Sequence, residues 1–558
     1  MVLAALSFGT QIALSSEVAP KRNLLLTGAT VHPAAGEAAR SASVLVVDGR
    51  VAFVGDAAEA RSKAPAGTPR VDLAGAHVFP GFVDAHAHLL GLGTSRVRLD
   101  LVGKQKDAIL ALVAARAKKA KPGEWILGRG WDQNLWPGKA FPLAKELDAA
   151  SPKNPVALSR IDGHASWVNG EALRAAGLPP EKPAPNDPDG GKIHRDAEGR
   201  PSGTLIDGAV DLVDRAIPAP SEKELESAFT RAFDDCARVG LTGVGDASGY
   251  SRREVAVLRG LAAKGRMPLR VYATYGAPDP ELPKLLAEGP VLEGNLTVRS
   301  VKMYADGALG SRGAALLAPY ADEPGNSGLV LTPRGKMDEV AALCLERGFQ
   351  LWTHAIGDRA NREVLDVYEA ALAKTAARDA RPRIEHAQVI APEDFARFAK
   401  LGVIASIQPT HATSDMPWAG ARVGPVRVKG AYAYHSLAAA GARLAGGSDF
   451  PVESEDPRLG FYAAVTRQDL SGQPEGGFLP AERLSRNEAL ALFTRDAAYA
   501  EFAETRRGRI AEGFDADFTV LARDVTSDGV AAADLPRVPV VLTVVGGEVT
   551  YRARSSRK

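Results

Sequence analysis

The stretch PGFVDAHAHLL, residues 80–90, decides the fold class and holds the first candidate functional residues. Its apolar, β-branched beginning predicts a buried strand at residues 82–86. Side chains two apart on a strand share a face, so His86 and His88 can bind one ion at the strand end. Histidine is also a common hydrogen-bonding residue in protein interiors, so the pair needs support from the rest of the chain.

Further short apolar segments alternate with helical stretches rich in Ala, Leu, Glu and Arg. This βαβα pattern predicts a parallel sheet, and eight such strands predict an α/β fold with a TIM-like (β/α)8 barrel. The predicted barrel strands are residues 82–86, 242–246, 270–275, 298–304, 350–354, 383–386, 403–408 and 443–447.

A ninth strand-like segment, residues 156–161, lies within a Pro-, Gly- and Trp-rich stretch at residues 103–218. That stretch is too long for an ordinary connection between a strand and a helix. We therefore exclude the ninth segment from the barrel and expect an inserted subdomain or lid.

Both ends of the chain are valine-rich and alternate in polarity, with turn signals at Asp48-Gly49 and Gly546-Gly547. We expect residues 23–78 and 505–555 to form one small composite β-sandwich domain. The barrel would then occupy residues 79–504.

Composition excludes several classes of protein. The 558 residues exceed what one hydrophobic core usually spans, and 68 Lys+Arg against 67 Asp+Glu give no electrostatic reason to expect nucleic acid. Cys236 and Cys344 are the two cysteines and form no C-x-x-C pair, which argues against thiolate-bound zinc and a disulfide framework. No stretch reaches the roughly 18 apolar residues of a membrane span.

The first 22 residues are mostly small and apolar, but no basic residue precedes Lys21. They fit either a degenerate export segment or a disordered terminus, so cytoplasmic and exported locations both stay open. We expect a small-molecule substrate as partner, and a homodimer is left open.

Polar residues end four other predicted barrel strands: Lys302, His354, His386 and Asp449. The carboxyl ends of barrel strands meet on one face, where residues far apart in sequence come together. Singly, these residues have ordinary interpretations: a surface lysine, core histidines and a turn aspartate. Jointly with the H-x-H pair they predict a site for zinc, or for manganese or iron.

Residues near these strand ends are candidate substrate contacts. Asp306, Ser311 and Arg312 follow the Lys302 strand, and His411 follows the seventh strand. The inserted segment adds His164 and a group of tryptophans that would wall an apolar pocket: Trp131, Trp136 and Trp167. A polar turn and ordinary packing are the alternatives for these residues.

Eight motifs carry a family resemblance: PGFVDAHAH, GRGWDQNLW, RIDGHASWVNGEAL, KMYADGALGSRGAAL, WTHAIGDRAN, RIEHAQ, GGSDFPV and GRIAEGFDADFTVL. With them the chain resembles the amidohydrolase superfamily (amidohydrolase family 3), in the subgroup that includes N-substituted formamide deformylases, over residues 23–552. The resemblance implies metal ligands at His86, His88, His354, His386 and Asp449. In many members the lysine that matches Lys302 is an N6-carboxylysine bridging two metals, so the resemblance implies one or two divalent ions, with two if Lys302 is carboxylated.

The resemblance further implies metal-assisted hydrolysis of a C–N bond of amide or formamide type, with Asp449 as the proton shuttle. Ester, lactone, carbamate and phosphotriester hydrolysis on the same site stay open. A deaminase of this scaffold would place glutamate three residues after the fifth-strand histidine, where this chain has Gly357. A non-catalytic relative would lack the ligand set that is present here.

Overall fold

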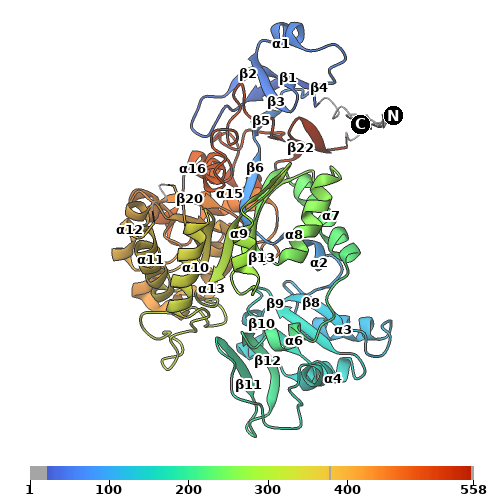
Figure 1. The fold of residues 1–558 in the computed structure, drawn as a ribbon, viewed down its shortest axis with the longest axis vertical. Coiled ribbons are helices and arrows are strands. Elements are labelled where there is room, and N and C mark those ends of the chain that lie inside the picture. The colour runs from blue at the N-terminus through green and yellow to red at the C-terminus, as the bar shows by residue number, and fades with distance from the viewer. Residues whose placement is uncertain (1–21, 376–378, 555–558) are drawn as a thin grey trace, which may run out of the picture.

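The computed structural model describes residues 22–375 and 379–554. At its centre, eight parallel strands follow one another in chain order around a nearly closed barrel (Figure 1). They are β6 (Phe82–Ala87), β13 (Leu241–Tyr250), β14 (Arg270–Gly276), β16 (Leu296–Tyr304), β17 (Gln350–Ala355), β18 (Arg383–His386), β19 (Ile404–Ile407) and β20 (Arg443–Gly446). A short strand, β15 (Val291–Glu293), pairs antiparallel with β16. The eight predicted barrel strands are thereby confirmed.

Helices cover the outside of these strands, which explains their continuous burial. Every residue of β6, β17, β18 and β19 is buried. Parallel strands enclosed on both faces are buried throughout, because neither face meets water, and the charged residues of β18 pair with each other inside the barrel. The covering helices include α7 (Glu222–Arg238), α8 (Arg252–Ala263), α10 (Arg334–Glu346), α11 (Asp358–Leu372), α12 (Phe395–Leu401), α14 (Tyr434–Ala439), α16 (Arg486–Leu492) and α17 (Arg495–Ala500).

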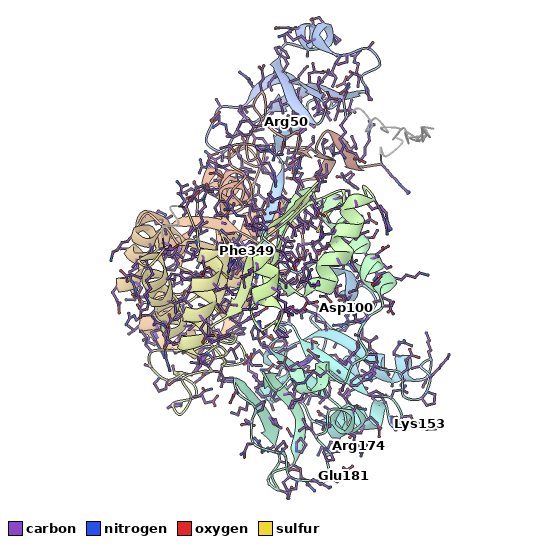
Figure 2. The ribbon with its side chains drawn as sticks, in the orientation of Figure 1. Arg50, Asp100, Lys153, Arg174, Glu181 and Phe349 are labelled. Atoms are coloured by element: carbon purple, nitrogen blue, oxygen red, sulfur yellow. The ribbon has the colours of Figure 1, made fainter. Side chains whose placement is uncertain are left out.

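The inserted segment forms its own six-stranded sheet, which lies below the barrel in Figure 1. Its strands are β7 (Leu99–Asp100), β8 (Ile126–Trp131), β9 (Val156–Arg160), β10 (Ala165–Val168), β11 (Gly191–Arg195) and β12 (Pro201–Asp207). The helices α3 (Lys106–Ala117), α4 (Ala144–Ala150), α5 (Gly170–Ala175) and α6 (Asp211–Asp214) accompany them. The excluded ninth segment is thus β9, outside the barrel. Charged pairs such as Arg174–Glu181 lie at the far end of this sheet (Figure 2).

Strands from both ends of the chain share one sheet, in the order β23-β22-β21-β5-β1-β2-β3, with β4 paired to β1. The N-terminal strands are β1 (Leu24–Val31), β2 (Arg40–Val47), β3 (Arg50–Gly55), β4 (Arg70–Asp72) and β5 (His77–Pro80). The C-terminal strands are β21 (Phe518–Leu521), β22 (Val540–Val545) and β23 (Glu548–Arg552). Only Gly81 separates β5 from β6, so this sheet runs directly into the barrel. A two-layer sandwich and the domain boundaries stay predictions.

The helices α2 (Leu89–Ser95), α9 (Leu282–Ala287), α13 (Pro409–Arg427) and α15 (Pro457–Thr466) follow the barrel strands β6, β14, β19 and β20, while α1 (Ala57–Lys63) packs on the terminal sheet. Within residues 22–375 and 379–554, no helix is both long and apolar enough to cross a membrane. The predicted export segment or disordered terminus falls almost entirely on residues 1–21, outside the described residues.

Candidate active site

Three of the expected metal ligands converge at one end of the barrel. Ligand atoms of His86, His386 and Asp449 all lie within 4.8 Å of one another, and all three residues are buried. His86 Nε2 lies 3.5 Å from Asp449 Oδ1, and the rings of His86 and His386 are 4.9 Å apart. The three residues come from β6, β18 and the turn after β20, because the barrel brings those strand ends together.

The other two expected histidines border this group. His88 Nε2 is 3.0 Å from Asp449 Oδ1, and the ring of His354 is 4.5 Å from that of His386. His88 lies just beyond the end of β6, where its backbone N–H donates to the carbonyl of Phe450 at 2.8 Å. All five residues therefore surround one small volume.

Two buried imidazole nitrogens of these ligands lie near a carboxylate at more than hydrogen-bond distance: His86 Nε2 is 3.5 Å from Asp449 Oδ1, and His354 Nε2 is 3.6 Å from Asp306 Oδ1. His86 Nε2 and His354 Nε2 are buried and make no hydrogen bond among the described residues. A buried polar atom without a partner costs about 1–3 kcal/mol. Imidazole nitrogens beside a carboxylate are the donor set that zinc and similar divalent ions bind, so these residues fit such an ion.

The opposite ring nitrogens of three histidines are held by buried or half-buried side chains. Nδ1 of His86 contacts Glu385, and Nδ1 of His386 is 2.8 Å from Gln408 Oε1. Nδ1 of His88 is 3.3 Å from the hydroxyl of Ser248, which donates to Asp246 at 2.5 Å. Such contacts fix the tautomer and orientation of metal-binding histidines. Sequence reasoning missed these supports, although Glu385 directly precedes His386 in RIEHAQ.

Glu385 is a buried anion in the floor of the site. Burial by itself would raise its pKa, but the charge of Arg383 and the contact with His86 hold the pKa of Glu385 well below its usual range. Arg383 donates from Nε to Oε1 at 2.7 Å and stacks on Trp352, with its guanidinium carbon 3.5 Å from the ring centre. A permanent negative charge therefore lies behind His86.

Lys302 is buried inside the barrel, with 1% of its surface exposed. Burial lowers the pKa of Lys302 to about 8. Burial likewise lowers the pKa of His88, His354 and His386, and the positive charge of Lys302 adds to each of these shifts. A lysine with a lowered pKa has more of the neutral amine that adds carbon dioxide.

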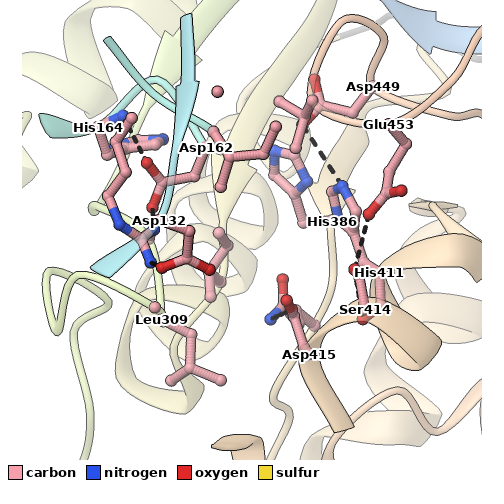
Figure 3. Close-up of a pocket in the computed structure, with 18 of the residues that line it drawn as sticks. Asp132, Asp162, His164, Leu309, His386, His411, Ser414, Asp415, Asp449 and Glu453 are labelled. Atoms are coloured by element: carbon pink, nitrogen blue, oxygen red, sulfur yellow. Dashed lines mark hydrogen bonds and ion pairs between the residues drawn. The ribbon is translucent and has the colours of Figure 1, made fainter. Parts of the chain in front are cut away.

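A cavity of about 310 Å³ opens against His354, His386 and Asp449 (Figure 3). In Figure 3, residues of the inserted segment, among them Asp162 and His164, face residues of the later barrel segments across this space. His164 and His411 line it, and their role as substrate contacts stays a prediction. His411 Nε2 is 3.8 Å from Asp449 Oδ2, and His164 Nδ1 is 2.6 Å from Asp207 Oδ1.

Two acids that sequence reasoning missed also line the cavity. Burial raises the pKa of Asp415 to about 8 and that of Glu453 to about 7. Asp415 accepts from the hydroxyl of Tyr432 at 2.8 Å, and Glu453 accepts from that of Ser414 at 2.6 Å. Near neutral pH, the protonated fraction of each acid can donate a hydrogen bond. Asp415 lies in α13 and Glu453 in a loop. Hydrophobic periodicity in the sequence does not predict that either side chain points into the cavity.

Asp306 and Arg312 do not line this cavity. The carboxylate of Asp306 accepts three backbone N–H groups, from Ile356 at 2.9 Å and from Gly357 and Ala315 at 2.8 Å each. It ties the loop after β16 to the end of β17. Arg312 instead pairs with Asp322 at 3.0 Å. Both side chains are thus engaged by other protein groups, and their expected role as substrate contacts stays a prediction.

Trp131 is fully buried in the core of the inserted sheet and also does not line the cavity. Its indole N–H donates to the carbonyl of Leu158 at 2.6 Å, and its ring stacks on Trp136 with centres 5.9 Å apart. Trp136 in turn packs against Trp167. These tryptophans therefore pack in the core of the insert, and a substrate contact by Trp131 stays a prediction.

Comparison with known proteins agrees with this geometry. The sequence model described as "Amidohydrolase family" matches residues 70–551. YtcJ of Bacillus subtilis, named as a candidate amidohydrolase, is 36% identical over 534 residues, covering 94% of this chain and 98% of YtcJ. The N-substituted formamide deformylase of Arthrobacter pascens is 27% identical, covering 96% of this chain and 99% of that protein.

A solved structure gives the same relationship in three dimensions. The crystal structure of an uncharacterized metal-dependent hydrolase from Pyrococcus horikoshii aligns with a TM-score of 0.75 and 28% identity. The alignment covers 90% of this chain and 98% of that one. With a family match over most of its length and a relative of 36% identity over nearly all of it, this chain belongs to the amidohydrolase family.

Proposed function

We propose that this protein is a metal-dependent hydrolase that cleaves a C–N bond of amide or formamide type in a small molecule. The observation that carries the proposal is the buried cluster of His86, His386 and Asp449, in which His86 Nε2 makes no hydrogen bond among the described residues. The relative named as an N-substituted formamide deformylase supports this bond type. The structural neighbour titled a metal-dependent hydrolase supports the requirement for metal.

The proposed ligands are the five residues around the small volume, His86, His88, His354, His386 and Asp449. Zinc is the ion we expect, and Lys302, if carboxylated, would complete a site for a second ion. A bound divalent ion supplies Lewis-acid polarisation of the scissile carbonyl and lowers the pKa of water.

The protein's own groups would handle the protons and orient the substrate. Asp449 is buried at the cavity wall, where its carboxylate can accept a proton from water and pass it to the leaving nitrogen. His164 is held through Nδ1 by Asp207, which leaves Nε2 to contact a substrate oxygen. Asp415 and Glu453 would donate hydrogen bonds from the opposite wall.

The main competing reaction is hydrolysis of a substrate whose scissile bond is C–O instead of C–N. Esters, lactones and carbamates present the same carbonyl to the same site, so they belong in the test. Deamination is disfavoured because Gly357 occupies the position of the glutamate acid and donates its N–H to Asp306.

The test combines metal analysis with a substrate panel on the purified full-length protein. We expect at least about one equivalent of zinc, manganese or iron per chain. We also expect the protein to hydrolyse formamides, amides or N-acyl amino acids. A chelator should abolish this activity, and added zinc should restore it. The exposed histidine variant His435→Gln should behave as wild type. Metal content far below one equivalent, or turnover of esters with every C–N substrate inert, would overturn the proposal.

A further inference from the structure

A second cluster of metal-ligand type lies in the terminal sheet, away from the cavity. Ligand atoms of His32, His77 and Asp524 all lie within 4.8 Å of one another. His32 follows β1, His77 begins β5, and Asp524 follows β21. Because β5 pairs with both β1 and β21, the sheet brings two N-terminal residues beside one from the C-terminal segment.

Distances within the cluster suit a shared ion better than a hydrogen bond alone. His32 Nε2 is 3.1 Å from His77 Nδ1 and 3.8 Å from Asp524 Oδ1. A hydrogen bond between the rings explains the first distance, but 3.8 Å is too long for a second one. Ligands about 2.0–2.2 Å from a tetrahedral zinc ion lie roughly 3.3–3.6 Å from one another. Both observed separations are within a few tenths of an ångström of that range.

Surrounding residues hold the cluster in place. His32 is buried and its ring stacks on Phe79, with centres 4.1 Å apart. Asp524 Oδ1 accepts from the backbone N–H of Thr526 at 2.9 Å and from its hydroxyl at 2.6 Å, which orients the carboxylate. Burial lowers the pKa of His32 to about 4, so this ring is neutral at pH 7. Asp524 keeps 24% of its side chain exposed, which leaves access for an ion and a water ligand.

The cluster is distinct from the candidate active site. His77 precedes His86 by nine residues along the nearly continuous run of β5 and β6. Nine residues of extended chain span up to about 30 Å. The sets {His32, His77, Asp524} and {His86, His386, Asp449} share no residue.

We propose that His32, His77 and Asp524 form a second metal site, which takes a zinc-class divalent ion and ties the C-terminal segment to the N-terminal strands. Its role is structural, because the main cavity lies elsewhere. The ion would add a cross-link between parts of the chain more than 400 residues apart, as the numbering of His77 and Asp524 shows. Metal binding of this kind contributes directly to folding stability.

Metal counting on the full-length protein tests the site separately from catalysis. Wild type, Asp524→Asn, His77→Gln and the control His435→Gln are dialysed against zinc and analysed for metal. We expect both cluster variants to bind one equivalent less than the control while keeping the hydrolase activity of the control. Circular dichroism checks folding, and Asp524→Asn preserves the shape of a partly exposed side chain. Equal zinc content in the control and both variants would overturn the proposal.

A background that lacks two of the five proposed active-site ligands gives a second readout. In His86→Asn/His386→Asn, zinc should still raise the unfolding temperature, because an ion that binds only the folded state stabilises it. Adding Asp524→Asn to that background should abolish the rise. An unchanged rise in the triple variant would show that zinc stabilises through other residues and would contradict the proposal, whatever the outcome of the activity assays.

Discussion

The Nδ1 atom of His86 contacts the carboxylate of Glu385, and both side chains are completely buried. Their partners extend the contact in two directions: Arg383 neutralises Glu385, and His86 Nε2 faces Asp449. His86 is thus oriented by a buried charge pair in the barrel interior. This arrangement leads to the first prediction.

Replacing Glu385 with glutamine should weaken metal binding by about 10–100-fold, the usual effect of removing a group that orients a ligand histidine. It should also destabilise the fold by about 3–5 kcal/mol, because Arg383 would keep a buried charge without a counter-ion. Zinc titration and denaturant unfolding measure the two effects. The surface variant Glu393→Gln is the matched control. Wild-type zinc affinity in Glu385→Gln would contradict the orienting role.

Replacing Asp449 with asparagine should lower kcat by about 10²–10⁴-fold, the range for loss of a general acid or base. Asparagine keeps the shape of the side chain but cannot accept the proton from water. Steady-state kinetics with zinc-saturated protein measure the loss, and metal analysis reports whether the ion is retained. Asp528→Asn, at a fully exposed position, is the control. A variant with bound metal and less than tenfold loss would exclude Asp449 as the proton shuttle.

Asp415 should make stability depend on pH. Burial raises its pKa in the folded protein from 3.8 to about 8, so the folded state holds the proton more tightly than the unfolded state. The resulting stabilisation is complete below about pH 4 and is lost as the pH rises through about 8. Asp415→Asn, a permanently neutral analogue, should therefore lose less unfolding free energy than wild type between pH 5 and pH 9. Parallel pH profiles from denaturant unfolding would contradict this.

Replacing Gly357 with alanine should destabilise the protein by about 1–3 kcal/mol or more, because a Cβ there would lie 1.9 Å from the carbonyl oxygen of Ala315. A glutamate at position 357 would make the same clash, because it also has a Cβ. The backbone of this chain therefore does not accommodate the glutamate acid of a deaminase at this position. Gly335→Ala is the matched control, since its Cβ would have no atom within 4 Å and it lies in α10. We expect that control to be neutral or slightly stabilising in thermal unfolding. Equal unfolding temperatures for the two variants would contradict the steric argument.

The barrel strands could be predicted because most strands enclosed by helices are rich in apolar and β-branched residues. Each expected ligand ends or directly follows such a strand, so the order of strands already implied that His86, His354, His386 and Asp449 would meet. The supports of these ligands could not be predicted in the same way. His86 and Glu385 are 299 residues apart, and no local pattern marks one as the partner of the other.

Local sequence patterns also could not show which candidate substrate contacts face the cavity. His164 and Trp131 both lie in conspicuous motifs of the insert, yet His164 faces the cavity while Trp131 packs in the sheet core. Residue type alone does not distinguish these outcomes, because tryptophan suits a pocket wall and a core equally well. The direction of each side chain depends on how the inserted sheet docks on the barrel.

The amino-acid sequence by itself determined the barrel, its strand order and the six residues expected at the metal site, because periodicity and strand ends are local properties. Tertiary structure alone decided which nitrogens lack partners, which acids line the cavity and that His32, His77 and Asp524 meet. Those features depend on distances between segments hundreds of residues apart, and on burial, which shifts the pKa of each group. Neither quantity exists until the chain has folded.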